Sequence, residues 1–493
     1  MIKLFPKKWS FLFKFRLFLG LILIILTLIF LYLKVVPFGS ITYIRDYTSN
    51  LRSGKGFIYG FTPAERVDLK SAEVPRLIGD PVYFSVFTPR TFDKAKVTIT
   101  YRDNLAINTP LVEIGVLADN IVWRYDLQPI DNKSLDYLML RWNKIEENGK
   151  LFLQKDTNYT SLSDWENDLA RGQIKGCFNE LENCLAVYNY SPKYNYQIPN
   201  YQPATPISIT TPLRGAHQFY VYVKDEPLRL EFNLVDLNTD TKPAPINIIL
   251  SSADKVIDAK TVADSNPKPG SGQTEEKKVI LEEQNLPAGV YKVEVKITDD
   301  MVIKKIISSV NRLSFINKVW PVSIEGSLKL YTDANYLQVK ALNPASLQTI
   351  DFGGQDFSLD EAYRQFDFKT NAVATNKEIN LAKDDVILEN NGVFAFSTSS
   401  LFNPSLPKVD RFFSVKNSLK YIVADYQAPL EYEGYKTATA ELNLKDAYRE
   451  NGKYSFMISI PGLKNDDDVN DNFEIYQIKI ELDGRTIWQK IWQ

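Results

Sequence analysis

Few residues of this chain could take part in catalysis or metal binding. His217 is the only histidine, so a Ser-His-Asp or Cys-His arrangement would have to use it. It stands at the entrance of an expected strand, where a lone histidine is more often a surface or edge residue. A zinc site takes three or four ligands, and two cysteines with one distant histidine barely supply three. Phosphate-binding glycine motifs are absent, so we expect no nucleotide and no other cofactor.

One carboxylate cluster, NDDDVNDN at 465–472, could offer oxygen atoms to Ca²⁺. An EF-hand loop that began at Asp466 would have Asp471 in place of the required glycine and Gln477 in place of the final glutamate. We therefore favour a solvated hairpin tip, with a calcium site as the alternative. The candidate ligands are Asp466, Asp468, Asn470 and Asp471.

Aromatic residues are the other candidates for contact with a partner. Tyrosines in a Pro- and Asn-rich stretch could stack on sugar rings, whereas the alternative is that they pack onto neighbouring domains. The candidate contacts are Tyr188, Tyr190, Tyr194, Tyr196 and Tyr201, together with Trp488 and Trp492 near the C-terminus.

An apolar run precedes all of these residues. Residues 17–33 contain no charge. This run is longer than the apolar part of a signal peptide, and no clean small-residue cleavage site follows it. As a helix, residues 17–36 would reach about 30 Å, the thickness of a bilayer core. We therefore expect an uncleaved signal anchor that crosses the cell membrane once.

The charge distribution gives the orientation of this anchor. Residues 1–45 hold seven basic residues and no acidic ones, so the rest of the chain has a net charge of −9. Cations stay on the cytoplasmic side, so we expect a cytoplasmic N-terminus and an extracytoplasmic bulk. An acidic ectodomain also argues against nucleic acid as a partner.

The two cysteines would then lie in an oxidising compartment. Cys177 and Cys184 are the only pair available, so we expect a disulfide. Seven residues of helix would hold their Cα atoms about 10.5 Å apart, which is too far to bridge. The segment between them must therefore turn back on itself.

Hydrophobic periodicity predicts β-structure almost throughout. Segments such as 81–87, 96–102, 228–237 and 475–482 alternate or run apolar and are punctuated by Gly, Pro, Asn or Asp. We therefore expect an all-β protein with tandem β-sandwiches of the Ig-like or jelly-roll-like kind. Start signals predict short helices after Ser163, after Ser358 and between Asn443 and Gly452.

The expected organisation follows from these patterns. We divide the chain into a basic tail (1–16), the transmembrane anchor (17–36), a juxtamembrane segment (37–75), a first sandwich (76–172), a disulfide loop and Tyr/Pro-rich linker (173–206), a second, Ig-like sandwich (207–312) and a third region (313–493) that is one sandwich or two packed pairs of sheets.

The segment LPAGVYKVEVKITDDMVIKKI at 286–306 resembles the closing strands of bacterial extracytoplasmic Ig-like and pre-peptidase-C-terminal-like sandwiches. The resemblance covers about residues 217–306 and implies a fold alone, because such domains serve adhesins, enzymes and scaffolds alike.

Together these patterns predict a membrane-anchored protein of the cell envelope that binds or scaffolds a protein or glycan partner and is not an enzyme. Two alternatives remain open: a glycan-active enzyme with an Asp/Glu pair, which leaves no local sequence signature, and a subunit of a surface assembly.

Overall fold

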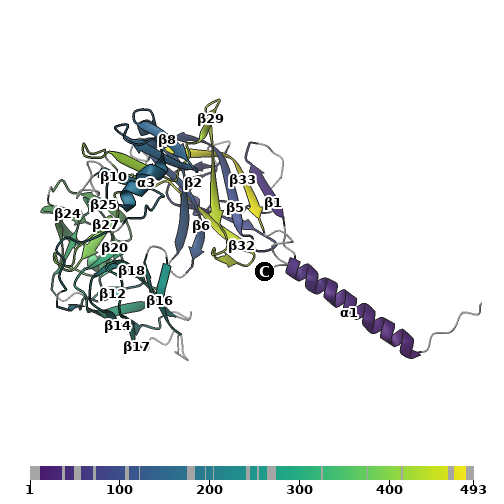
Figure 1. Ribbon diagram of the computed structural model, residues 1–493, viewed down its shortest axis with the longest axis horizontal. Helices are drawn as coiled ribbons and strands as arrows, with labels where there is room; N and C mark the ends of the chain where they lie inside the picture. Colours follow the sequence, from purple (N-terminus) through teal and green to yellow (C-terminus); the bar gives the residue numbers. More distant parts are fainter. Residues whose placement is uncertain are drawn as a thin grey trace, which may run out of the picture. The chain divides into compact units, whose positions relative to one another are not determined.

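The computed structural model describes the chain except for residues 1–10, 36–38, 49–56, 70–73, 106–109, 121–122, 175–183, 195, 204, 240–244, 253–254, 264–273, 324–325, 373, 375, 412, 414, 465–470 and 485–493. Strands predominate in the described ranges, as the alternating patterns predicted (Figure 1). The chain forms two compact units. Unit 1 comprises Met1–Lys144, Asn148–Leu151 and Ala424–Gln493, and unit 2 comprises Ile145–Glu147 and Phe152–Val423.

The N-terminal apolar run forms helix α1 (Phe11–Val35), which has 25 residues. Its stretch Phe13–Leu31 is long and apolar enough to cross a membrane, and none of that stretch is buried. At 1.5 Å per residue, the whole helix is about 37 Å long, which exceeds a hydrocarbon core of about 30 Å. Length and composition thus agree with the predicted spanning segment.

Unit 1 contains two sheets. The seven-stranded sheet has the order β2-β3-β33-β5-β30-β29, with β1 also paired to β33. Its strands are β1 (Ser40–Asp46), β2 (Val67–Asp68), β3 (Arg76–Leu77), β5 (Lys94–Asn104), β29 (Leu430–Tyr432), β30 (Tyr435–Asn443) and β33 (Asn472–Asp483). The five-stranded sheet has the order β31-β32-β6-β7, with β4 paired to β32. Its strands are β4 (Val82–Phe87), β6 (Leu111–Asp119), β7 (Arg124–Asn132), β31 (Arg449–Glu450) and β32 (Lys453–Ser459).

The two sheets of unit 1 share one hydrophobic core. Val97 and Ile99 of β5 and Ile478 of β33 are fully buried in it together with Phe84 of β4 and Phe456 of β32. The Phe84 and Phe456 rings stack with centroids 5.3 Å apart. In β4 and β5, buried residues alternate with half-buried or exposed ones, which places one face of each of these two strands in this core.

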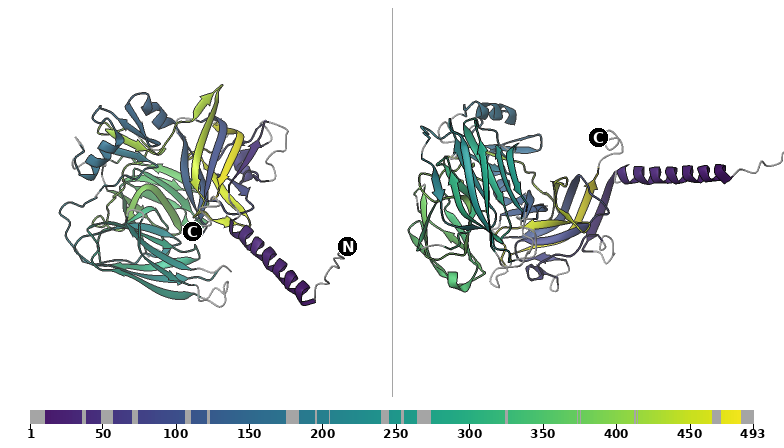
Figure 2. Two further views of the ribbon diagram at one scale, coloured as in Figure 1. Left: turned by 45° about the vertical axis from the view of Figure 1, so that its right-hand side comes forward. Right: turned by 90° about the horizontal axis from the view of Figure 1, so that it is seen from below.

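Strands from the two ends of the sequence alternate in the seven-stranded sheet. β33 pairs with β5 from Asn472–Asn104 to Asp483–Lys94 and with all seven residues of β1. Figure 2 shows these early strands, purple to blue, beside the late yellow strands. The division expected from the sequence placed residues 424–493 in a third domain. In the structure they complete the first one instead.

A four-stranded sheet has the order β10-β28-β9-β8, and most of its residues belong to unit 2. Its strands are β8 (Asn143–Glu147), β9 (Lys150–Gln154), β10 (Leu185–Tyr188) and β28 (Tyr421–Ala424). A five-stranded sheet follows with the order β11-β19-β14-β17, in which β12 also pairs with β19. Its strands are β11 (Ile207–Ile209), β12 (Leu213–Arg214), β14 (Leu228–Asp236), β17 (Glu275–Glu283) and β19 (Met301–Ser308).

The remaining strands of unit 2 form a twelve-stranded sheet of order β16-β15-β18-β13-β20-β27-β21-β26-β23-β24, with β22 paired to β25 and β27. They are β13 (His217–Val223), β15 (Ile246–Ser252), β16 (Lys255–Val262), β18 (Gly289–Lys296), β20 (Leu313–Val319), β21 (Leu328–Thr332), β22 (Tyr336–Ala341), β23 (Gln348–Phe352), β24 (Gln355–Leu359), β25 (Gln365–Lys369), β26 (Lys377–Leu381) and β27 (Val386–Ala395).

This large sheet crosses the domain boundary that the sequence suggested at residue 312. Strand β13 pairs with β20, for example at Phe219 and Phe315, and the same core runs from Ile209 to Phe394. The segment 313–395 is therefore continuous with 207–312 through backbone hydrogen bonds and apolar packing.

Helices apart from α1 are short in the described ranges. α2 (Lys133–Met139) is capped by Asn132, and α3 (Leu162–Ala170) is capped by Ser161, whose hydroxyl accepts from Asp164 N. The helix expected after Ser163 therefore exists, with its cap two residues earlier. The 3₁₀ turns are Ala64–Arg66 and Pro344–Ser346. The other two expected helices are wrong, because 358–366 and 443–452 form strand ends and turns.

Candidate functional site

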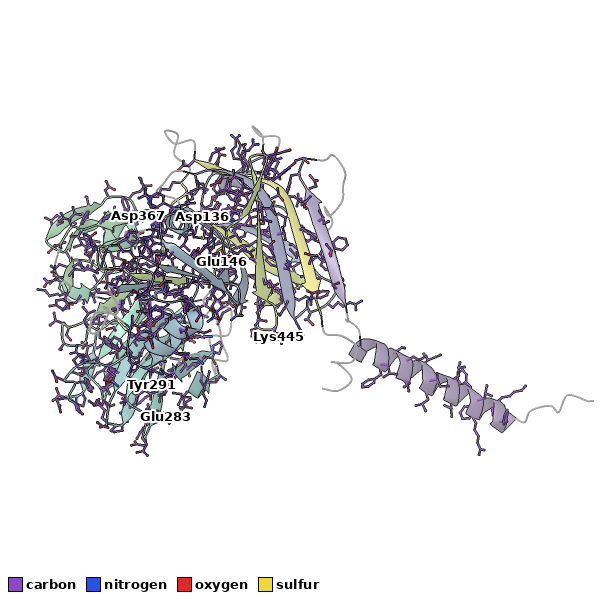
Figure 3. All side chains as sticks on the ribbon, turned by 45° about the horizontal axis from the view of Figure 1, so that its top comes forward. Asp136, Glu146, Glu283, Tyr291, Asp367 and Lys445 are labelled. Atoms are coloured by element: carbon purple, nitrogen blue, oxygen red, sulfur yellow. The ribbon has the colours of Figure 1, made fainter. Side chains whose placement is uncertain are left out.

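A buried group of charged side chains lies in unit 1, where β5, β7, α2 and β30 meet. We call it the Asp131 network. Its members are Tyr101 and Asp103 of β5, Asp131 of β7, Lys133 and Asp136 of α2, Tyr426 of the segment that precedes β29, and Lys436 of β30. Asp136 is labelled in Figure 3.

Lys436 lies between two carboxylates. Its Nζ is 2.9 Å from Asp131 Oδ2 and 3.4 Å from Asp103 Oδ1. The side chains of Asp131, Asp103 and Lys436 are 1%, 10% and 18% exposed. Lys133, 2.8 Å from Asp103 Oδ2, supplies the second cation. Ions lose hydration when they are buried, and the close pairing of opposite charges offsets this desolvation cost.

Two tyrosines complete the network. Tyr101 Oη donates to Asp131 Oδ2 at 2.7 Å, and the Tyr101 ring stacks on Phe473 of β33. Tyr426 Oη donates to Asp136 Oδ1 at 2.8 Å and accepts from Asn132 N at 3.0 Å. These contacts join the segment that enters unit 2 to the segment that returns from it.

Burial dominates the electrostatics of the network. It raises the pKa of Asp131, an effect that the Lys436 charge opposes. It also raises the pKa of Asp136 to about 6, with the like charge of Asp131 contributing. Burial and the nearby carboxylates raise the pKa of Tyr101 and Tyr426. For Lys436, burial lowers the pKa, but the Asp131 and Asp103 charges outweigh it, so the pKa is raised.

The geometry limits the chemistry that the network can perform. Asp131 and Asp103 contact the same ammonium group, so their oxygens are close enough for a carboxylate pair of the glycosidase kind. Both carboxylates are nearly inaccessible, however, and a sugar must reach its catalytic acids. The arrangement instead brings an amine, a carboxyl carbon and proton carriers together away from bulk water. Asp131 Oδ1 is buried and makes no hydrogen bond within the described residues.

The tyrosines predicted to contact a partner pack within unit 2. Tyr188 is buried at the end of β10, and Tyr190 and Tyr194 pack against the core around Trp165. Tyr190 Oη donates to Glu166 Oε1, and Tyr194 Oη donates to the Pro404 carbonyl. These contacts lie within unit 2.

Tyr196 and Tyr201 belong to a smaller apolar cluster with Tyr222 and Phe402. Tyr201 is 5% exposed, meets the Tyr222 ring edge-on at 4.9 Å and donates to Glu226. Burial raises its pKa. Its ring has little surface left for a ligand.

Several other predicted residues fall outside the described ranges. These are Asp466, Asp468, Asn470, Cys177, Trp488 and Trp492. Asp471 is described and directly precedes β33. Cys184 is 2% exposed in the core around Trp165. The calcium alternative, the tryptophan contacts and the disulfide therefore stay predictions.

His217 is buried, contrary to the surface or edge position expected from the sequence. It is 2% exposed at the start of β13. Its Nδ1 lies 2.9 Å from the Gly215 carbonyl, and Nε2 accepts from Trp320 N at 3.2 Å. These partners suit a neutral ring with the proton on Nδ1. Burial lowers its pKa to about 4.

Sequence reasoning missed every member of the Asp131 network. Tyr101 lies on the inward-facing side of an alternating strand, yet Asp131 and Lys436 are 305 positions apart. The one local signal is polar: Asp131 and Asn132 close a strand and cap the helix that follows. Such a signal indicates a helix start and carries no information about Lys436.

No protein-family model and no curated protein matches this chain. Among solved structures, infectious bursal disease virus of the Gt strain aligns at 10% identity over 89% of this chain and 81% of that chain, with a TM-score of 0.14. The Gx strain aligns at 9% identity over 90% and 78%, also with a TM-score of 0.14. A TM-score this low supports no conclusion about fold or function.

Proposed function

We propose that this chain is a membrane-anchored extracytoplasmic protein of the cell envelope that binds or scaffolds a protein or glycan partner through β-sandwich domains. The observation that carries the proposal is the connection between α1 and unit 1. α1 ends at Val35 and β1 begins at Ser40, and every residue of β1 pairs with β33. A helix fit to span a bilayer is thus joined within five residues to a folded β domain.

The basic residues before α1 support a cytoplasmic N-terminus. In this orientation the sheets of unit 1 lie on the extracytoplasmic side, and unit 2 (Ile145–Glu147 and Phe152–Val423) is inserted into the sequence of unit 1. The chain passes between the two units at four points, after residues 144, 147, 151 and 423, so unit 2 is tethered to unit 1 at more than one point. This arrangement suits presentation of a binding surface.

Exposed apolar side chains in unit 1 are the candidate contacts of this proposal. Leu430 and Tyr432 of β29 are 74% and 75% exposed, at the edge of the seven-stranded sheet. A sheet edge has unpaired backbone groups that a partner strand can use. Tyrosine and leucine beside such an edge add apolar contact area.

The test uses the full-length chain in its own membranes. A membrane-impermeant crosslinker should capture an envelope partner, and purified chain should retain isolated envelope glycan if the partner is a glycan. The double variant Leu430→Ala/Tyr432→Ala should lose most of this capture. Leu69→Ala is the matched control, because Leu69 is also in unit 1 and is 62% exposed.

The alternatives give different results. Release of shortened glycans by the purified chain would contradict a binding role and favour the glycan-active enzyme. Capture that is unchanged in the double variant would move the contact away from β29, and no capture with any probe would contradict the proposal.

A further inference from the structure

We propose that Lys436 and Asp131 join through a side-chain amide, an isopeptide bond that forms within the chain. The two groups already meet, with Nζ 2.9 Å from Oδ2. A carboxyl C–O bond is about 1.2 Å long, so Nζ lies at most about 4 Å from Asp131 Cγ. Reacting atoms about 3–3.5 Å apart are nearly in position for attack.

Burial distinguishes this pair from the other ion pairs. Among the described pairs, those of Lys436 alone have both side chains less than a fifth exposed. Lys479 and Glu481 have the same 2.9 Å separation, yet they are 35% and 30% exposed. A solvated pair stays ionised and its amine stays protonated. In a site that excludes water, condensation removes two costly buried charges.

The reaction balances without any further reagent. The lysine ammonium and the aspartate carboxylate become one amide and one water molecule. The N–C bond forms between Nζ and Cγ, and the bond from Cγ to Oδ1 breaks. Two protons leave the ammonium group and end on Oδ1, which departs as water.

Neighbouring side chains are placed to assist each part of this step. Asp103 Oδ1, 3.4 Å from Nζ, can accept a proton from the amine and deliver it to the leaving oxygen. Tyr101 Oη donates to Oδ2 at 2.7 Å, where negative charge develops in the tetrahedral intermediate. Oδ2 remains as the amide oxygen, and Oδ1 has no hydrogen bond among the described residues to hold it.

The bond would change how unit 1 holds unit 2. It would connect β7 of the five-stranded sheet to β30 of the seven-stranded sheet. It would also close a covalent ring over the 305 positions between Asp131 and Lys436, which contains all of unit 2. Force applied to unit 2 could then not peel the two segments of unit 1 apart. Formation of this bond would not depend on what the protein binds.

Mass spectrometry of the purified full-length chain tests the bond directly. Trypsin cannot cleave after an acylated lysine, so Tyr125–Lys133 should be recovered joined to Tyr421–Lys445. The joined peptide should be lighter than its two parts by one water molecule. Free Tyr125–Lys133 together with Tyr421–Lys436 would overturn the proposal, because cleavage after Lys436 requires a free amine.

Two variants and an internal control sharpen this experiment. Lys436→Arg keeps a cation beside Asp131 but should yield only separate peptides. Asp103→Asn should lower the joined fraction, and complete joining in this variant would overturn the proton-carrier role of Asp103. Trypsin should still cleave after the solvated Lys479.

A wild-type chain cut by protease within unit 2 should run as one band on a reducing, denaturing gel, and separation of the fragments would again overturn the bond.

Discussion

At the scale of single residues, His217 shows what burial does to a titratable group. Its ring is neutral and bonded at both nitrogens inside unit 2. The unfolded chain takes up a proton near pH 6.5, whereas the folded chain resists protonation down to about pH 4. The resulting stabilisation is complete above pH 6.5 and is lost as the pH falls towards 4.

We therefore expect the free energy of unfolding to fall between pH 6.5 and pH 4, with about 3 kcal/mol of that loss due to His217. His217→Gln should be less stable than wild type at pH 7, and the difference should shrink as the pH falls. Urea unfolding of the detergent-solubilised wild type and variant at several pH values measures the free energy of unfolding and the difference between the two chains. A constant difference across this range would contradict the assignment.

Gly115 is a residue whose lack of a side chain matters. A Cβ atom there would lie 2.6 Å from the Asp126 carbonyl oxygen and 2.8 Å from a Leu127 methyl. The carbonyl belongs to the paired strand β7 and cannot move freely. Gly115→Ala should cost about 1–3 kcal/mol of stability, as measured by urea unfolding.

Gly60→Ala is the matched control for this substitution. A Cβ atom added at Gly60 would have no atom within 4 Å. The stability of the Gly60→Ala variant should therefore stay within about 0.5 kcal/mol of wild type. Equal stabilities of the two variants would show that β6 and β7 can separate without cost.

Residue types alone predicted little of the Asp131 network. The chain has 60 acidic and 58 basic residues, and most are solvated. What distinguishes Asp131 is its contact with Lys436, and a contact over 305 positions leaves no local pattern. The tyrosines at 188–201 depend on distant residues in a different way. A loop-like stretch of tyrosines suggested a binding surface, and the sequence did not show that the cores around Trp165 and Phe402 would bury Tyr188 and Tyr201 and partly bury the others.

At the scale of elements, the alternation of apolar and polar residues predicted strands well, whereas the helix start signals predicted short helices poorly. The segments 81–87, 228–237 and 475–482 correspond to β4, β14 and β33 within a few residues. The predicted helix after Ser358 failed because Phe366 and Phe368 follow at a spacing of two, and β25 pairs with β22. A local cap contributes about 1 kcal/mol, less than a strand gains from pairing and burial.

The predicted disulfide would close the segment before β10 into a covalent loop. We expect Cys177 and Cys184 to be joined, which adds about 2.5 kcal/mol by the loop-entropy estimate for an eight-residue ring. Alkylation of the denatured chain should label no cysteine before reduction, and it should label both cysteines after reduction. Labelling of two thiols without reduction would contradict the pair. Cys184→Ser should then be less stable by a similar amount.

At the scale of the whole molecule, the sequence predicted the strand content but not the connectivity. Domains were expected in chain order, because composition changes mark linkers but carry no record of which strands pair. The pairing of β33 with β5 and β1 decides that residues 424–493 belong to unit 1. Likewise, the pairing of β13 with β20 continues one sheet across residue 312.

Connectivity predicts the result of a C-terminal truncation. A chain that ends at Val423 lacks β29 to β33, so β5 loses both neighbours in its sheet. Its buried face, including Val97 and Ile99, would then be exposed. Limited proteolysis of this variant should degrade unit 1 rapidly and leave a resistant fragment of about residues 152–423. Persistence of an intact residue 40–144 fragment would contradict the division into units.

The proposed orientation predicts the result of proteolysis on intact spheroplasts. External protease should digest both units and leave a small membrane-embedded fragment that contains α1. Lysis before the treatment should additionally remove the basic tail (1–16), which the intact membrane protects. A mature chain whose N-terminal sequencing begins near Ser40 would show that α1 is removed as a signal sequence.

The late position of β33 in the chain also sets the order of events during synthesis. Strand β5 is complete at Asn104, but its partner strand ends at Asp483. At about 5–20 residues per second, this interval lasts roughly 20–80 s. Unit 2 is nearly continuous in sequence and can fold meanwhile, whereas β1 and β5 must wait with unsatisfied edges. Ribosome pausing or slow translocation after unit 2 would lengthen this wait, and holding chaperones should associate with the N-terminal strands of the nascent chain until Asp483 emerges.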